Sequence, residues 1–162
     1  MTYNACSFTG HRKIEDRHKA GIENMIARAV RYAYELGCRR FFSGGALGFD
    51  TLAAKEVIRF RMSHPDCTLG LILPCKNQNE RWGDDDCRMY DYILAQADTV
   101  EYVSDEYTDS CMRERNGRLA VSCDVLIAYV GRERSGSGQT LRMAKELGIE
   151  VYNLFPALER EK

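Results

Sequence analysis

The chain has 162 residues, about the length of one domain. Hydrophobic residues make up 44% of it and charged residues 29%, a composition that supplies a core and excludes a disordered chain. Its 23 basic and 24 acidic side chains give a formal net charge of −1, which argues against a protein that coats nucleic acid. A local basic pocket for one phosphate is compatible with that balance.

No apolar run approaches the ~20 residues of a transmembrane helix, and the first residues lack the charged and apolar regions of a secretory signal. The seven cysteines are odd in number and include no Cys-x-x-Cys pair, which argues against a disulfide framework and against a zinc site. We therefore expect a soluble, reduced, cytoplasmic protein that holds no metal and no resident cofactor.

Hydrophobic periodicity and turn residues predict strand–helix pairs along the whole chain. In the first half, in chain order, we expect a strand at 3–8, a helix at 14–36, a strand at 40–43, a helix at 49–61, a strand at 69–73 and a helix near 85–97. In the second half we expect a strand at 99–103, a helix at 109–121, a strand at 124–130, a helix at 140–147 and a strand at 150–154. We expect the first helix to end at Gly37 and the third strand to end at Pro74.

Repeated strand–helix alternation is typical of a parallel sheet with helices on both faces. The strands at 69–73 and 125–130 are apolar without alternation, as expected when both faces are covered. The sequence therefore predicts a single α/β domain over residues 1–162, three-layered and Rossmann-like, with a mostly parallel sheet. In such folds ligands lie beyond the carboxyl ends of the strands, so the loops after the strands are the candidates for function.

The first such loop is Thr9-Gly10-His11-Arg12. Its glycine permits a tight turn, and the following arginine can reach an anionic ligand. The alternative is a turn in which His11 and Arg12 only cap neighbouring carbonyl groups, and the sequence leaves both interpretations open.

The second loop is rich in glycine: Ser43-Gly44-Gly45 is followed by Gly48 and Asp50. Exposed N–H groups and the positive end of the next helix predict a phosphate-binding turn, with Asp50 accepting from a ribose hydroxyl or capping the helix. The segment matches neither Gly-x-Gly-x-x-Gly nor a Walker loop, so a nicotinamide dehydrogenase or an ATPase is not expected.

After the third strand come Pro74, Gln78 and Trp82. The tryptophan either stacks on a base or anchors the core or an interface. The acidic residues at 84–86 could suggest a metal site. We interpret them instead as carboxylates at the N-terminus of a helix, where the helix dipole favours negative charge.

The fourth and fifth loops each add candidates for an anion site. Arg115 and Arg118 share a helix face with Asn116 beside them, and this face either reaches the ligand or is solvated. The stretch 131–140 is a second glycine-rich strand-to-helix turn, in which Ser137 and Thr140 supply hydroxyl groups. Two such turns that flank one crevice would grip a phosphorylated ligand.

With these segments in view, the chain resembles the YpsA-like family of the SLOG superfamily, which also includes the LOG phosphoribohydrolases and the DNA-processing protein DprA. The matching elements are Phe8-Thr9-Gly10-His11-Arg12, Ser43-Gly44-Gly45-Ala46-Leu47-Gly48-Phe49-Asp50, Pro74-Cys75 with Gln78 and Trp82, Met112 with Arg115-Asn116, and Gly136-Ser137-Gly138-Gln139-Thr140. The resemblance implies a Rossmann-like fold, a nucleotide-derived ligand and self-association into a homo-oligomer.

Together, the turns and the resemblance assign one set of residues to ligand binding. The set is Thr9, Gly10, His11, Arg12, Ser43, Gly44, Gly45, Gly48, Asp50, Pro74, Gln78, Trp82, Arg115, Asn116, Gly136, Ser137, Gly138, Gln139 and Thr140.

The chain departs from the LOG enzymes where those enzymes carry Pro-Gly-Gly-x-Gly-Thr-x-x-Glu. The position of their hydrolytic glutamate is Met143 here, which cannot act as an acid or a base, and Asn116 stands where they have lysine. The resemblance therefore does not decide whether the chain is an enzyme.

Three hypotheses follow. The first is a cytoplasmic module that binds a nucleotide or nucleotide sugar, as a ligand sensor. The second is a LOG-like nucleotide N-glycosidase, which needs Asp50 or Glu114 as a substitute carboxylate. The third is a DprA-like nucleic-acid accessory protein, for which the net charge gives no sign of a basic surface.

Overall fold

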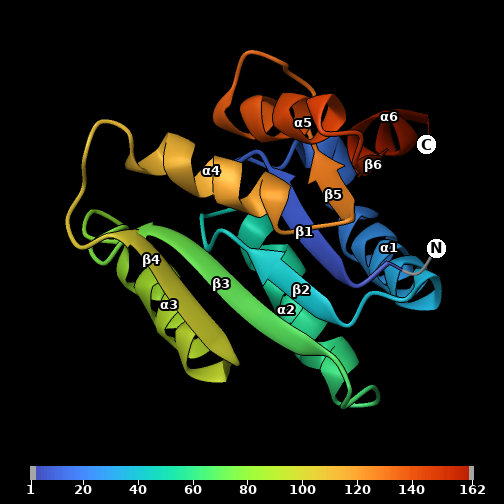
Figure 1. Cartoon of the computed structure of the whole chain (residues 1–162), viewed down its shortest axis with the longest axis horizontal. Helices are drawn as coiled ribbons and strands as arrows, with labels where there is room; N and C mark the ends of the chain where they lie inside the picture. Colours follow the sequence, from blue (N-terminus) through green and yellow to red (C-terminus); the bar gives the residue numbers. More distant parts are fainter. Residues whose placement is uncertain (1–2, 161–162) are drawn as a thin grey trace.

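The computed structural model describes residues 3–160 as one six-stranded sheet flanked by helices (Figure 1). The strands are β1 (Ala5–Gly10), β2 (Arg40–Ser43), β3 (Thr68–Cys75), β4 (Thr99–Ser104), β5 (Val125–Tyr129) and β6 (Glu150–Asn153). The helices are α1 (Ile22–Leu36), α2 (Phe49–Arg61), α3 (Asp84–Gln96), α4 (Cys111–Val121), α5 (Gly136–Glu146) and α6 (Leu154–Arg160), with a short 3-10 helix η1 (Asp16–His18) before α1.

All the strand pairs are parallel, in the order β4-β3-β2-β1-β5-β6. The chain winds from β1 to β4 toward one edge of the sheet, and then α4 carries it back so that β5 lies on the other side of β1 (Figure 1). Ser7 of β1 consequently pairs with Phe42 of β2 on one side and with Leu126 of β5 on the other. Ligands bind at such a reversal of strand order, beyond the carboxyl ends of the strands.

Helices cover both faces of the sheet, which confirms the predicted three-layer α/β architecture. α4 and α5 pack together on one face, and α1, α2, α3 and α6 cover the other (Figure 1). Between the sheet and the second layer lies an aromatic core, in which the rings of Phe8 and Phe41 are 6.2 Å apart and those of Phe49 and Tyr129 are 5.9 Å apart. The apolar strands β3 and β5 are buried almost throughout for this reason.

Two expectations at the start of the chain are wrong. β1 runs to Gly10, two residues beyond the predicted end, because Thr9 and Gly10 still pair with Ala128 and Tyr129 of β5. The first helix begins at residue 22 and not at residue 14. The Tyr129 hydroxyl accepts the backbone N–H of Glu15 and contacts the His18 ring at 2.6 Å. These contacts hold residues 15–18 in a conformation that differs from the predicted α-helix.

Other boundaries shift because of local hydrogen bonds. α5 begins four residues before the predicted start, since the Ser135 Oγ accepts the N–H of Gly138 and caps the helix. α4 begins at residue 111 and not at 109, and β3 continues past Pro74 to pair Cys75 with Ser104. Sequence reasoning missed α6, which buries Leu154 and Leu158 against the core.

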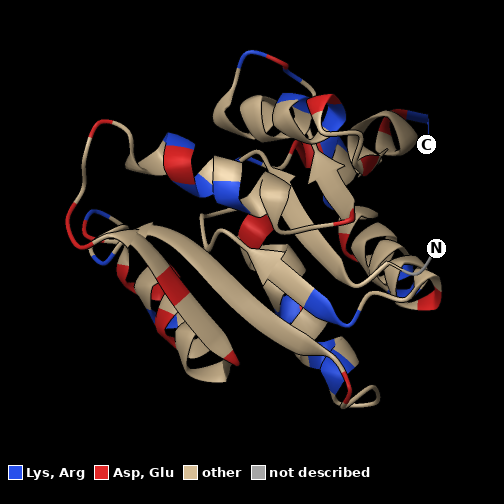
Figure 2. Cartoon of the chain, viewed as in Figure 1, with Lys and Arg blue, Asp and Glu red and all other residues tan. Residues whose placement is uncertain are grey.

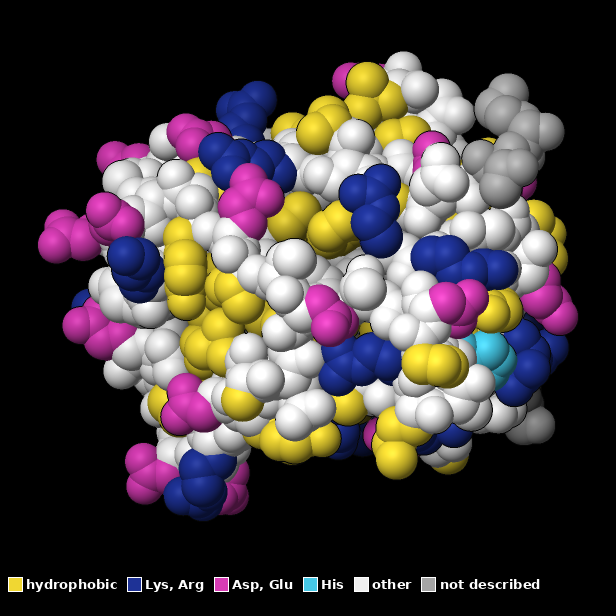
Figure 3. Space-filling model, turned by 60° about the horizontal axis from the view of Figure 1, so that its bottom comes forward, with side chains coloured by type: hydrophobic (Ala, Val, Ile, Leu, Met, Phe, Trp, Pro, Cys, Tyr) yellow, Lys and Arg dark blue, Asp and Glu magenta, His cyan; other side chains and the backbone are white. Residues whose placement is uncertain are grey.

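Charges of both signs are distributed over the molecule. Lys and Arg alternate with Asp and Glu on the helices of both layers (Figure 2), and the face seen in Figure 3 carries basic and acidic side chains next to one another. Among residues 3–160, none of the helices combines the length and the apolar character needed to cross a bilayer.

Candidate functional site

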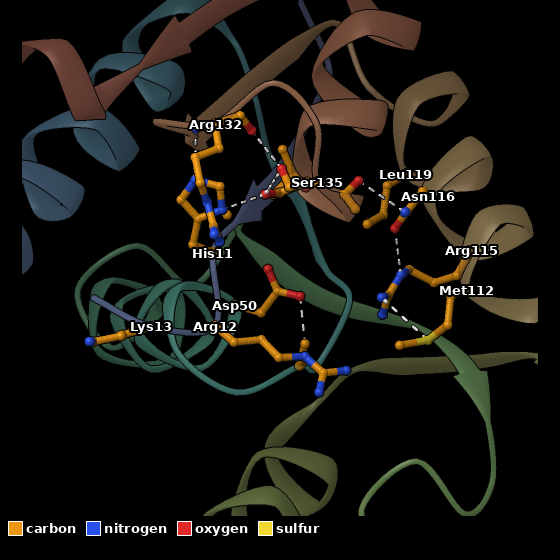
Figure 4. A pocket seen from close by; sticks show the side chains of 15 residues that line it. His11, Arg12, Lys13, Asp50, Met112, Arg115, Asn116, Leu119, Arg132 and Ser135 are labelled. Atoms are coloured by element: carbon orange, nitrogen blue, oxygen red, sulfur yellow. Dashed lines mark hydrogen bonds between the residues drawn. The ribbon is translucent and has the colours of Figure 1, made fainter. Parts of the chain in front are cut away.

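A polar pocket of about 360 Å³ lies at the carboxyl ends of β1 and β5, where the strand order reverses (Figure 4). Three arginines and a lysine line it against a single carboxylate, that of Asp50, so the pocket is net positive. Its residues come from the end of β1 and the loop after it (Thr9, Gly10, His11, Arg12, Lys13), from the approach to α2 (Ala46, Asp50), from α4 (Met112, Arg115, Asn116, Leu119) and from the β5–α5 turn (Arg132, Ser135, Gly136, Ser137).

His11 fixes one wall of this pocket. Its Nε2 accepts the backbone N–H of Gly131 at 2.8 Å and that of Arg132 at 3.3 Å, so this nitrogen carries no proton. The proton is therefore on Nδ1, which donates to the Ser137 Oγ at 3.1 Å. Burial, with the Arg132 charge, lowers the pKa of His11 and keeps the ring neutral. His11 thus ties the β5–α5 turn to the end of β1, and it caps backbone N–H groups rather than carbonyl groups.

The N-terminus of α5 forms the adjoining wall. Ser135 caps the helix by accepting the N–H of Gly138. The N–H groups of Gly136 and Ser137 have no acceptor among residues 3–160, and both residues line the pocket beside Arg132. Free amides at the positive end of a helix dipole attract an anion.

Two backbone amides of the first glycine-rich turn donate to side chains of the protein itself. The Gly45 N–H donates to the Ser43 Oγ at 3.2 Å, and the Ala46 N–H donates to the Asp50 Oδ2 at 3.3 Å. Arg115 Nη1 in turn donates to the carbonyl of Gly44 at 2.7 Å. Two amides of this predicted phosphate-binding turn, those of Gly45 and Ala46, are thus already used, and Ser43, Gly44 and Gly45 do not line the polar pocket.

Asp50 and Arg115 are buried charges that face the pocket. Asp50 is 5% exposed, and burial raises its pKa to about 6 although the Arg115 charge opposes the rise. Its second oxygen, Oδ1, is buried and has no hydrogen-bond partner among the described residues. Arg115 is 6% exposed, and its Nε donates to Asn116 Oδ1 at 2.9 Å. Burial lowers the pKa of Arg115, although an arginine stays charged in proteins.

Asn116 links Arg115 to the start of α5. Its Nδ2 donates to the carbonyl of Gly136 at 3.2 Å and to the side chain of Gln139 at 3.3 Å. Three further predicted residues support the same helix turn without lining the pocket. Gln139 receives this bond, Thr140 donates to the Gly136 carbonyl at 3.4 Å, and a Cβ on Gly138 would meet the backbone of Glu133 at 2.1 Å.

Pro74, Gln78 and Trp82 line a second pocket of about 610 Å³. It adjoins the polar pocket, because Arg12 and Met112 line both. The Trp82 ring lies edge-on to Tyr90 with centroids 5.2 Å apart, so the tryptophan anchors part of the core and also forms a wall of the cavity.

Sequence reasoning left several lining residues out of the site. Lys13 follows Arg12 directly, and Arg132 and Ser135 belong to the glycine-rich stretch 131–140, so proximity to the predicted residues was the available signal. Arg118, in contrast, pairs with Glu101 outside the pocket. Met143 does not line the pocket either, and its sulfur lies 4.0 Å from where a Cβ on Gly117 would be.

Comparisons with known proteins agree with this architecture. The model of the family YpsA, described as the YspA SLOG family, matches residues 6–151. Among curated proteins, the uncharacterised SPbeta prophage-derived protein YoqJ of Bacillus subtilis is 27% identical over 158 residues, which cover 89% of this chain and 88% of YoqJ. A UPF0398 protein of Bacillus cereus is 28% identical over 138 residues, which cover 83% of this chain and 75% of that protein.

Two solved structures share the fold at 19% identity. The DNA processing protein A of Helicobacter pylori, whose description concerns a single-stranded DNA binding mode, superposes with a TM-score of 0.66 over 93% of this chain. DNA processing protein A (DprA) of Streptococcus pneumoniae superposes with a TM-score of 0.65, also over 93% of this chain. The chain spans 64% and 50% of the lengths of these two proteins.

Proposed function

This chain belongs to the YpsA family of SLOG proteins, and we propose that its polar pocket binds a nucleotide or nucleotide sugar through a phosphate group, as a ligand sensor. One observation carries the proposal: at the start of α5, Gly136 and Ser137, whose amides have no acceptor among residues 3–160, line a pocket together with Arg12, Arg115, Arg132 and Lys13. Backbone amides at a helix N-terminus and nearby guanidinium groups are the donors that a phosphate needs.

The two adjoining pockets suggest how such a ligand lies. The phosphate sits at Gly136 and Ser137, near Arg132. The rest of the ligand extends past Arg12 into the second pocket, where Trp82 offers an aromatic surface for a base. Both glycine-rich turns were predicted to bind phosphate, and this arrangement keeps the phosphate at the second turn alone.

The test is a thermal-shift and calorimetry screen of the whole chain against AMP, ADP-ribose, NAD and cyclic nucleotides, with adenosine as the control that lacks a phosphate. A ligand at ~100 times its dissociation constant adds about 2.7 kcal/mol to the free energy of unfolding. Arg132→Ala should weaken binding about tenfold, as for the loss of a charge-assisted hydrogen bond. Arg134→Ala is the matched control, since Arg134 lies in the same turn but does not line the pocket. No shift with any phosphate-bearing compound would contradict the proposal.

The likeness to two DprA structures supports a second candidate, single-stranded nucleic-acid binding. A strand-binding surface needs basic residues along a groove, whereas here basic and acidic residues alternate (Figures 2 and 3). Retention of an oligonucleotide that weakens steeply with salt would favour this candidate over the first.

The N-glycosidase hypothesis depends on Asp50, because it is the carboxylate that lines the pocket and burial raises its pKa into the range of a working acid or base. Incubation with AMP or inosine monophosphate tests it. Release of free base and ribose 5-phosphate would make the chain an enzyme, and binding without release leaves it a sensor.

A further inference from the structure

We propose that Asp50 accepts a hydrogen bond from the 2-hydroxyl group of the ligand's sugar, so that the site selects ribose over 2-deoxyribose. This inference rests on the proposed function and names the chemical class of the ligand beyond its phosphate. Its basis is the buried oxygen of Asp50 that has no partner among the described residues, in a side chain that lines the polar pocket.

Only one oxygen of Asp50 is used within the protein. Oδ2 accepts the N–H of Ala46 at 3.3 Å, whereas Oδ1 is buried and has no partner among residues 3–160. A buried carboxylate oxygen without a donor is unfavourable, and native proteins rarely leave one unless a ligand or a water satisfies it. The missing partner must therefore supply a hydrogen-bond donor.

The surroundings of Asp50 determine what kind of donor fits. A phosphate offers only acceptors at neutral pH and is repelled by a carboxylate, so it does not bind at this end of the pocket. Hydroxyl groups meet the requirement, because each donates to the carboxylate and can still accept from the neighbouring Arg115. That guanidinium uses its N–H groups on Gly44, Asn116 and, weakly, Met112, and it has five in all.

The pocket is therefore divided by charge. Figure 4 shows Asp50 between the His11–Ser135 side of the pocket and Arg12, with Arg115 across from it. Amides at the start of α5 serve the phosphate on one side, and Asp50 with Arg115 serves the hydroxyl groups of the sugar. A ribose 5-phosphate unit carries both kinds of group within one small molecule.

The experiment compares ribose 5-phosphate with 2-deoxyribose 5-phosphate by calorimetry and NMR titration, so that the base plays no part. For the wild-type chain we expect ribose 5-phosphate to bind at least about tenfold more tightly, as for a hydrogen bond to a charged group. In Asp50→Asn, whose amide oxygen can still accept the Ala46 N–H, the ratio should fall below about threefold. Arg132→Ala is the matched control, and it should weaken both sugars equally and leave the ratio unchanged.

Each outcome decides one of the two proposals. If the wild-type chain binds both sugars with equal affinity, the role of Asp50 is refuted while phosphate binding stands. A tenfold preference that persists in Asp50→Asn refutes it as well. If neither sugar phosphate nor any nucleotide binds, the proposed function itself is wrong. The wild-type comparison is decisive even if the variant does not fold.

Discussion

The chain has two glycine-rich turns that look alike in sequence and differ in structure. In the first turn, residues 43–48, the Gly45 amide donates to Ser43 and the Ala46 amide donates to Asp50. In the second turn, residues 131–138, the amides of Gly136 and Ser137 have no acceptor within residues 3–160, and both residues line the polar pocket. Glycine content shows that a backbone can approach a ligand, whereas the side chains that reach the turn decide whether its amides remain available.

The glycines of the two turns also serve different needs. Gly48 has a φ of +79°, and a Cβ there would lie 2.0 Å from the carbonyl oxygen of Arg12. A Cβ on Gly136 would meet nothing closer than the Asn116 side chain at 3.9 Å. Gly48 is thus required for packing the β1 loop against α2, whereas Gly136 has space, unlike its neighbour Gly138, where a Cβ would meet the backbone of Glu133.

The largest expected effect follows from this difference. Gly48→Ala should lower the free energy of unfolding by about 4 kcal/mol, because it combines backbone strain with a clash against the main chain. Gly136→Ala should change it by less than about 0.5 kcal/mol. Urea denaturation of both variants measures the two values, and similar losses would show that Gly48 and Gly136 do not differ as described.

A smaller effect is the pH dependence of stability that comes from Asp50, which accepts the Ala46 N–H in the first turn. Because burial raises the pKa of Asp50 from 3.8 to about 6, the folded state holds the proton more tightly than the unfolded chain. The stability that protonated Asp50 gives the folded state is therefore fully present below pH ~4 and is lost as the pH rises through about 6. The free energy of unfolding changes by an amount on the order of 3 kcal/mol. Asp50→Asn lacks this dependence.

The measurement is the unfolding free energy of the wild-type chain and of Asp50→Asn between pH 4.5 and pH 7.5. Relative to the variant, the wild-type chain should lose stability as the pH rises across this window. A difference between the two proteins that stays constant with pH would mean that the carboxyl titrates normally and is not held in the first turn as described.

Much of the fold could be predicted from the sequence because its signals are local. Apolar β3 and β5, the helical spacing within α1 and the stop at Gly37 all reflect residues close together in the chain. The start of α1 could not be predicted, since Tyr129 lies more than a hundred residues from Glu15 and His18, which it holds. The cap at Ser135 was local and readable, yet the glycines after it obscured the helix start.

The site could be predicted to a similar extent. Parallel strands bring the loops after them to one edge, so polar segments as distant as Arg12 and Ser137 were expected to meet, and both line the polar pocket. Which amides are already used was only partly readable from the sequence. The amide of Gly131 donates to His11 across 120 positions, which no local pattern reveals, whereas the amides of Gly45 and Ala46 donate to Ser43 and Asp50, two and four positions away.

Phosphate binding at the second turn is tested most directly by an NMR titration of the amide-labelled chain with AMP. We expect saturable shifts of the Gly136 and Ser137 amide signals, with at most small changes at Gly45, whose N–H already has an acceptor in Ser43. Saturable shifts centred on Gly45, with Gly136 and Ser137 unaffected, would contradict this expectation.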